Sequence, residues 1–185
     1  MQKIIGLLLI LGMAVTAVAI PNITEAAESD TFTITVTVSY LEIALRNIAD
    51  AADFTTWDLA TKAVNTITTM ESAEGILVEV GNSSAYKLTG QITGACDWTA
   101  GDSDTTSADT YLLAMQGAAT AACPEDMTVA GDATAIVITT PADITNATGA
   151  AATGIFLYGA FTTPKTTTSG KLQTITVTIA IAAAS

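Results

Sequence analysis

Four aspartates in one short polar stretch are the residues in this sequence best suited to chemistry. Asp97, Asp102, Asp104 and Asp109 lie within 13 residues that also contain Gly101, serines and threonines. Ca²⁺ takes about six to eight oxygen ligands, so an acidic loop of this kind suits it. The EF-hand spacing fails, because a loop starting at Asp102 would need glycine at Ser107 and glutamate at Leu113. The stretch therefore predicts either an irregular calcium site or a solvated acidic loop.

The two tryptophans are the second candidate for binding. Trp57 precedes Asp58 and Trp98 follows Asp97, an aromatic–acid pairing that suits carbohydrate binding. The alternative is that both indoles cap the core of a β-sandwich, as the buried tryptophan of immunoglobulin domains does. Both interpretations stay open on the sequence alone.

Catalytic groups are scarce in this chain. It contains no histidine, which excludes Ser-His-Asp and Cys-His systems and the usual zinc hydrolase sites. Carboxylate pairs could in principle hydrolyse glycosides. The chain is only 5% aromatic, however, and offers little to line a sugar cleft. We therefore interpret the carboxylates as solvent-facing and predict that the protein is not an enzyme. The carboxylates considered are Glu71, Glu74, Glu79, Glu125 and Asp126.

The sequence contains two cysteines, Cys96 and Cys123. An even pair in an exported protein most often forms a disulfide, and we predict one here. The alternative, a pair of metal ligands, lacks further ligands of a suitable type.

The N-terminus predicts export. Lys3 precedes an uncharged apolar stretch over residues 4–19, which is shorter than the roughly 20 residues of a transmembrane helix. Small residues allow cleavage after Ala19 or Ala26. We predict a signal peptide over residues 1–26 and one domain over 27–185, secreted or at the cell surface. The alternative is a retained N-terminal anchor.

Charge narrows the choice of partners. The chain has 18 acidic and 6 basic residues, a net charge of −12. Such a chain is repelled by nucleic acids and by anionic membrane surfaces. We expect it to bind no nucleic acid and, after signal cleavage, no membrane.

Hydrophobic alternation predicts an all-β fold. Over Thr31 to Arg46, apolar residues alternate with threonine and then change parity near Tyr40, which indicates a long strand with a bulge or bend. The stretch 76–92, with a turn at 81–84, favours a hairpin. Segments with some helical potential lack a sustained amphipathic face. We therefore predict a single antiparallel β-sandwich. The expected strands span 30–46, 55–59, 76–80, 86–92, 111–115, 135–139, 154–161 and 172–181.

Several of these segments together resemble a loose group of secreted, mostly uncharacterised bacterial Ig-like domains. The resemblance covers most of residues 27–185 and implies an Ig-like sandwich at the cell surface. It brings no catalytic residues with it, and the cysteine pair is not part of the pattern. The matching segments are Trp57-Asp58-Leu59, residues 80–83, Tyr86-Lys87-Leu88, residues 97–101, Tyr111-Leu112-Leu113, and residues 156–161, 164–168 and 173–179.

Two functions remain. The first is a non-catalytic structural protein that assembles with itself into an envelope or filament. In that case the long segment Thr31 to Arg46 would pair with the sheet of a neighbouring copy. The alternative is an adhesin or carbohydrate-binding module that uses a calcium-loaded acidic loop and the two tryptophans.

Overall fold

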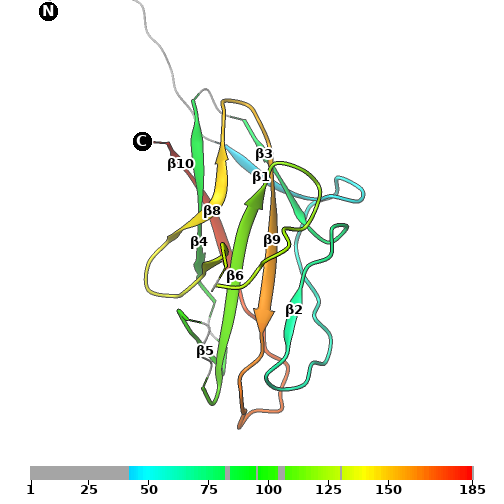
Figure 1. Ribbon diagram of the computed structural model, residues 1–185, viewed down its shortest axis with the longest axis vertical. Helices are drawn as coiled ribbons and strands as arrows, with labels where there is room; N and C mark the ends of the chain where they lie inside the picture. Colours follow the sequence, from blue (N-terminus) through cyan, green and yellow to red (C-terminus); the bar gives the residue numbers. More distant parts are fainter. Residues whose placement is uncertain (1–41, 82–83, 95, 104–106, 130, 185) are drawn as a thin grey trace, which may run out of the picture. The chain divides into compact units, whose positions relative to one another are not determined.

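The computed structural model describes residues 42–81, 84–94, 96–103, 107–129 and 131–184 (Figure 1). The chain divides into two units, residues 1–37 and 38–185, and the described residues all belong to the second. They contain strands and no helix, so the predicted all-β class is confirmed. Among them there is accordingly no helix that could span a membrane. The predicted signal peptide, the bend near Tyr40 and residues 31–41 of the first strand lie outside the described residues.

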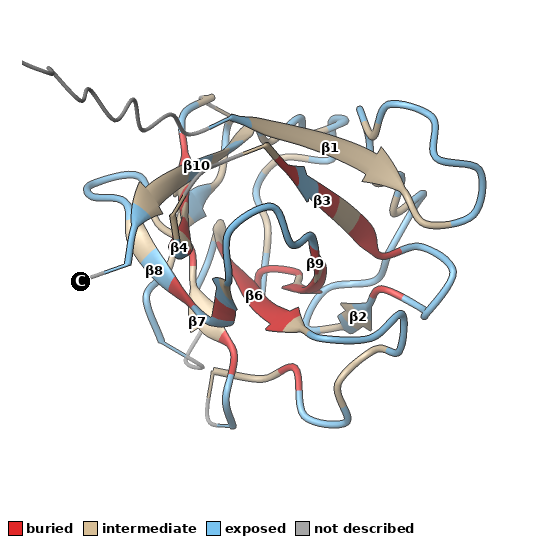
Figure 2. Cartoon of the chain, turned by 90° about the horizontal axis from the view of Figure 1, so that it is seen from above, coloured by how far each residue is buried: buried red, intermediate tan, exposed pale blue. Residues whose placement is uncertain are grey.

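Ten strands form one connected sheet. Their order is β1-β3-β9-β6-β8-β4-β10, while β2 pairs with β9, and β5 and β7 pair with β6. In Figure 2 the strands surround the buried side chains, with β1 and β3 on one side and β10, β4 and β8 on another. The bounds are β1 Ile43–Asn47, β2 Ile67–Thr69, β3 Ile76–Val80, β4 Tyr86–Ile92, β5 Thr99–Ala100, β6 Thr110–Ala118, β7 Thr134–Ala135, β8 Ala142–Gly149, β9 Ile155–Thr162 and β10 Val177–Ala183.

The sheet is mixed, whereas an antiparallel one was predicted. Most pairs are antiparallel, but β6 runs parallel to both β5 and β8. The predicted hairpin over residues 76–92 is also wrong. β3 pairs with β1 and β9, while β4 pairs with β8 and β10. The turn between β3 and β4 therefore joins two different parts of the sheet.

Burial explains why some strands were found from the sequence. β3 and β4 alternate between buried and more exposed residues, which is the pattern of a strand with one face in the core. The central strands β6 and β9 are instead buried along nearly their whole length, on both faces. Such strands appear in a sequence as continuous apolar runs. The largest fully buried side chains are those of Tyr86, Tyr111, Tyr158, Leu88, Ile92, Ile136, Leu157, Val78 and Pro164.

Strand β8 was not predicted, because its regular alternation is interrupted. Lys87 and Thr89 of β4 pair with Thr148 and Asp143, so β8 has extra residues between two stretches of pairing. Asn146, inside the irregularity, has a φ of 57°, a left-handed conformation that asparagine tolerates better than most residues. The irregularity lets β8 reach β6 through the single pair Gln116 and Thr145 while the rest of β8 stays on β4.

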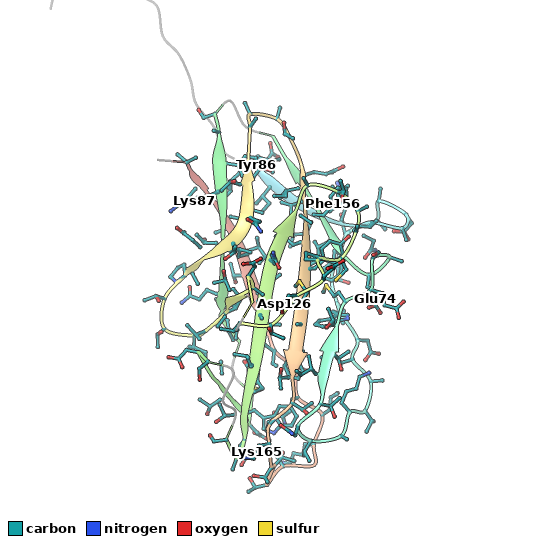
Figure 3. All side chains as sticks on the ribbon, in the orientation of Figure 1. Glu74, Tyr86, Lys87, Asp126, Phe156 and Lys165 are labelled. Carbon is teal, nitrogen blue, oxygen red and sulfur yellow. The ribbon has the colours of Figure 1, made fainter. Side chains whose placement is uncertain are left out.

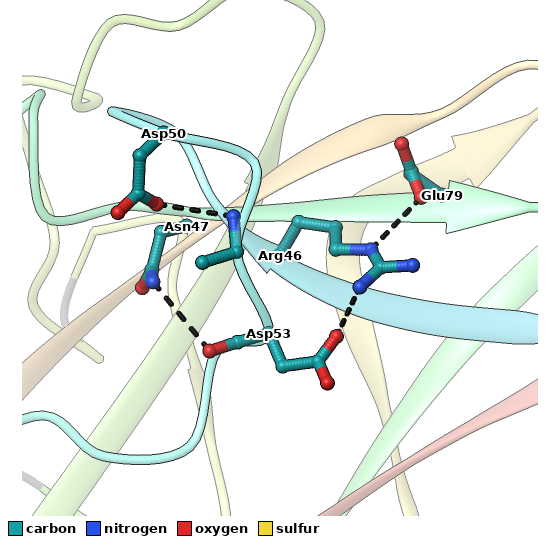
Figure 4. Close-up of polar contacts among 6 residues, drawn as sticks. Arg46, Asn47, Asp50, Asp53 and Glu79 are labelled. Carbon is teal, nitrogen blue, oxygen red and sulfur yellow. Dashed lines mark hydrogen bonds and ion pairs between the residues drawn. The ribbon is translucent and has the colours of Figure 1, made fainter.

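The outer edge of β1 is partly occupied. Asn47 N donates to Ala52 O and Phe54 N donates to Leu45 O, so residues 52–54 bond to the second half of the strand. Figure 4 shows the side chains that hold this loop: Arg46 donates to Glu79 on β3 and to Asp53. Only the part of β1 before Leu45 therefore has an outer edge without a partner among the described residues.

Other predicted strands differ from the structure. Residues 55–59 are not a strand, the segment 135–139 contributes only the end of β7, and the last strand starts at Val177 instead of Leu172. Strands β2 and β5 were missed because three and two residues are too few to show a period.

Candidate functional site

The candidate site lies where the loop that follows β5 meets the segment between β9 and β10. Asp109 sits at the centre of this junction. Its Oδ1 accepts hydrogen bonds from Thr167 Oγ1 and Thr168 N, both at 2.8 Å, and its Oδ2 accepts one from Thr168 Oγ1 at 2.6 Å. Its backbone N–H donates to Thr166 O at 2.8 Å. Asp109 thus joins two loops that are more than 50 residues apart in sequence.

Asp109 adopts a φ of 54°, the left-handed region that aspartate tolerates better than bulky residues. The hydrogen bonds from Thr168, first through its side chain and then through its backbone, lower the pKa of Asp109 below its ordinary 3.8. Donors that point at a carboxylate favour its charged form. The ionised carboxylate is therefore part of the structure of this junction.

Trp98 and Asp97 belong to the same junction. Trp98 Nε1 donates to Thr167 Oγ1 at 3.0 Å, and its half-buried ring packs against the core. Asp97 Oδ2 accepts a hydrogen bond from Ser169 Oγ at 3.2 Å, and Asp97 N donates to the side chain of Gln173 at 2.8 Å. The indole is held by a polar contact at one edge and apolar contacts elsewhere, as expected of a partly buried tryptophan.

The structure brings together only part of the predicted calcium ligand set. Asp97 and Asp109 both contact the segment 167–169, Asp102 has an exposed side chain in the loop, and Asp104 lies outside the described residues. Within the described ranges, no three histidine, cysteine, aspartate or glutamate residues cluster closely enough to hold a metal ion. Both oxygens of Asp109 already accept bonds from threonine. The calcium site stays a prediction, and the arrangement seen is a hydrogen-bonded clamp between two loops.

The lowered pKa of Asp109 predicts a loss of stability in acid. A carboxylate whose folded pKa is lowered stabilises the fold above its unfolded pKa, near 3.8, and this contribution disappears as the pH falls through the folded pKa. We expect Asp109→Asn to melt below the wild type at pH 7. The difference between the two melting temperatures should shrink as the pH falls below 3.8. Thermal melts followed by circular dichroism between pH 2.5 and 7 measure this. A constant difference across that range would contradict it.

Trp57 also lies against the core instead of standing free. Its ring is half-buried, and Cζ3 lies 3.4 Å from the position that a Cβ on Gly159 of β9 would occupy. That separation is an ordinary van der Waals distance, so the indole lies directly over the backbone of β9. Trp57 and Trp98 come from different loops, and both pack as core caps. A role of either ring in ligand binding stays a prediction.

The predicted disulfide is absent, because both cysteines are free thiols. Cys96 Sγ lies 3.2 Å from Trp98 O, next to the start of β6, where Thr99 pairs with Thr110. Cys123 comes after the end of β6 in the chain, and its backbone N–H donates a hydrogen bond to Ser72 Oγ at 3.1 Å. A strand rises about 3.3 Å per residue, so opposite ends of β6 are far beyond the roughly 7 Å limit for a disulfide.

The sequence also contains a serine and a lysine at a spacing that is typical of some enzymes, which the sequence prediction missed. Ser84 and Lys87 are three residues apart, the Ser-x-x-Lys arrangement of some acyl-transfer enzymes. Lys87 Nζ lies 2.7 Å from Asp143 Oδ2 on β8, in an ion pair that links two neighbouring strands. An ammonium group engaged in this way is not a free amine base. The geometry thus favours a structural role for Lys87.

A small pocket of about 200 Å³ was also not predicted. It lies between β2, β6, β9 and residues 127–129, and its lining is mostly apolar. The sequence gives no sign of it, because β2 has only three residues and β6 is a continuous buried run, so neither shows an alternation of buried and exposed residues. The lining residues are Asn65, Ile67, Leu112, Ala114, Met127, Thr128, Val129, Ala160 and Thr162.

No protein family, curated protein or solved structure matches the chain. The resemblance to secreted Ig-like domains therefore stays a prediction, and function has to be argued from the residues and the fold.

Proposed function

We propose that this protein is an exported, non-catalytic structural subunit that assembles with copies of itself by strand addition. The segment Thr31–Val38 of one copy would add to the open edge of β10 in the next. Assembly of this kind uses the main-chain hydrogen bonds of an edge strand for affinity and alternate side chains for register.

The observation that carries the proposal is the edge that β10 presents. β10 is the last strand in the sheet order, and β4 is its one partner among the described residues. Natural edge strands are protected by lysine, proline, bulges or short length. The seven residues of β10 read Val-Thr-Ile-Ala-Ile-Ala-Ala and carry none of these features. Its pairing with β4 continues over all seven residues without a register shift.

The faces of β10 and of the proposed donor segment are compatible. Val177, Ile179 and Ile181 pack against the core but remain only half-buried, while Thr178 and Ala180 are exposed. The donor segment repeats the same alternation, with Phe32, Ile34, Val36 and Val38 on one parity and threonine on the other. An added strand in this register would extend the apolar row of β10 and keep threonine toward solvent.

The opposite edge of the sheet supports the choice of β10 as the acceptor. The second half of β1 already bonds to residues 52–54, and Arg46 anchors that loop. In the sequence, the proposed donor segment precedes β1. The proposed donor segment and the acceptor edge of β10 are different parts of the chain, so the contact would be heterologous, as in head-to-tail assembly.

A pair of matched substitutions tests the proposal in the chain that starts at residue 27. Val36→Lys places a charge on the apolar parity of the donor segment, where it would have to be buried in the assembled form. Thr35→Lys places the same charge one residue away, on the parity that faces solvent. We expect the wild type and Thr35→Lys to form polymers as concentration rises, and Val36→Lys to form none by strand addition.

Light scattering after size-exclusion chromatography and negative-stain microscopy measure the outcome. Equal assembly of the two variants would show that the parity of the segment is irrelevant and would refute strand addition. A wild type that stays monomeric at every concentration would refute self-assembly itself.

A further inference from the structure

The apolar pocket beside β6 and β9 has the size and shape to receive one aliphatic side chain. Ala114 and Ala160, which are cross-strand partners on β6 and β9, both line it. Larger apolar side chains line it as well, among them Ile67, Leu112 and Met127. Ile67 is 56% exposed, so the apolar surface continues from the pocket to the outside.

The loop between β9 and β10 carries an aliphatic side chain that packs against almost nothing in its own chain. Leu172 is 94% exposed, more than any other large hydrophobic side chain among the described residues. Two residues earlier, at Gly170, no atom outside the glycine and its chain neighbours lies within 4 Å of the position of a Cβ, so this part of the loop borders solvent. A single exposed leucine is ordinary on a protein surface. A leucine that projects from a loop and a vacant apolar pocket on the same chain form a complementary pair.

Charges around the two features have opposite signs. Lys165 and Lys171 flank the projecting leucine, and both are exposed. Glu125, Asp126 and Asp132 lie in the segment that contributes Met127 to the pocket, and these three are exposed as well. None of the five takes part in the three ion-pair contacts seen among the described residues. Asp97 and Asp109 also lie near the loop, with their carboxylates bonded to its own hydroxyl groups.

The two features lie apart within one molecule. In Figure 3, Lys165 marks one end of the described unit, and Asp126 lies nearer the middle, between Lys165 and the end marked by Tyr86. The exposure of Leu172 shows that its side chain does not occupy the pocket of its own chain. A projecting side chain (a knob) on one part of a molecule and a complementary pocket on another make a heterologous contact, which builds either a closed ring or an open chain of subunits.

We propose that the loop over residues 165–172 of one copy docks on the pocket of a second copy, with Leu172 between Ala114 and Ala160 and the two lysines facing the acidic segment 125–132. This proposal rests on the proposed function, because it supplies a second contact between the same subunits. The contact is small and is expected to be weak alone. It adds to strand addition by raising the effective concentration of neighbouring subunits.

A complementation experiment isolates this contact. All variants carry Val36→Lys in the chain that starts at residue 27, so that strand addition does not contribute. Leu172→Asp removes the knob and Ile67→Asp disrupts the rim of the pocket, both at exposed positions. Thr174→Asp, also exposed, is the matched control for added charge near the loop. Sedimentation velocity across a range of concentrations reports association, and thermal melts confirm that each variant is folded.

We expect the parent and Thr174→Asp to associate into assemblies larger than dimers. Leu172→Asp and Ile67→Asp should each require about tenfold more protein for the same degree of association, the ratio that corresponds to about 1.4 kcal/mol. An equimolar mixture of the two should recover association but stop at dimers. Leu172 of the Ile67→Asp chain can enter the intact pocket of the Leu172→Asp chain, but the other pocket and loop of that dimer are both defective. Added salt should weaken the parent's association.

Two results would overturn the docking contact. One is a parent that stays monomeric at all concentrations, and the other is a mixture no different from its components. Neither result affects strand addition, which is judged separately by comparing Val36→Lys with Thr35→Lys. Conversely, equal assembly of that pair would refute strand addition and leave the complementation result valid.

Discussion

Replacing Gly117 by alanine is expected to lower the free energy of unfolding by about 1–3 kcal/mol, the usual cost of overpacking a protein interior. A Cβ at residue 117 would lie 2.4 Å from Asn146 O and 2.6 Å from Ala147 Cα, both backbone atoms of β8. A backbone atom cannot rotate away as the end of a side chain can, so β6 and β8 would have to separate. The gain of about 0.4–1 kcal/mol from a less flexible unfolded chain does not offset this cost.

Gly159→Ala is the matched control. Gly159 also lies in a central, buried strand, but the nearest atoms to its Cβ position, in Trp57 and Met70, are 3.4 Å and 3.7 Å away. These are ordinary van der Waals distances, so we expect unchanged or slightly increased stability. Urea unfolding followed by tryptophan fluorescence compares both variants with the wild type. A Gly117→Ala protein as stable as the wild type would contradict the close approach of β6 and β8.

The fold could be predicted as far as local patterns allow. The strands β3 and β4 were placed correctly because one face of each is buried and the other is not, which produces a period of two. The partners of these strands could not be predicted from that period. Alternation shows which side chains face the core, but it does not show which neighbouring strand supplies the hydrogen bonds. The hairpin prediction failed for this reason.

The end of the chain shows a second limit. Alternation continues from Leu172 into the last strand, yet pairing begins only at Val177. Gln173 explains part of the difference, because its side chain accepts a hydrogen bond from Asp97 N and donates one to Lys171 O. These contacts tie residues 171–173 to a loop instead of to β4. As a result Leu172, which the pattern placed in a strand, projects into solvent.

Only the aspartates of the candidate site were predicted from the sequence. The aspartates of the acidic loop stand out in the sequence because they are clustered, and Asp109 does organise a junction. Its partners Thr167 and Thr168 could not be identified, because threonine is abundant throughout the chain and these two lie 58 and 59 residues away. An acidic cluster indicates many oxygen atoms. Whether they accept bonds from a cation or from hydroxyl groups is decided by the distant segment that packs against them.

Leu157→Ala is expected to be the second strongly destabilising substitution. Leu157 is fully buried on β9, at the position where its neighbours in register are Ile76 on β3 and Gly117 on β6. Truncation removes apolar contacts where three strands meet and leaves a cavity that the rigid sheet cannot close. Such substitutions cost about 2–5 kcal/mol. Domains of this size are typically stable by only about 5–15 kcal/mol, so urea unfolding should show a large shift of the midpoint.

Leu172→Ala is the control for the same chemical change at an exposed position. Its side chain is 94% exposed in the folded monomer, so truncation removes almost no contact and unfolding should be unchanged. Self-association should nevertheless weaken, because the proposed contact between copies loses its central side chain. The two variants thus separate the stability of the subunit from the affinity between subunits. If Leu172→Ala destabilised a dilute, monomeric sample, the leucine would be packed within its own chain, and the exposed knob on which the docking contact depends would not exist.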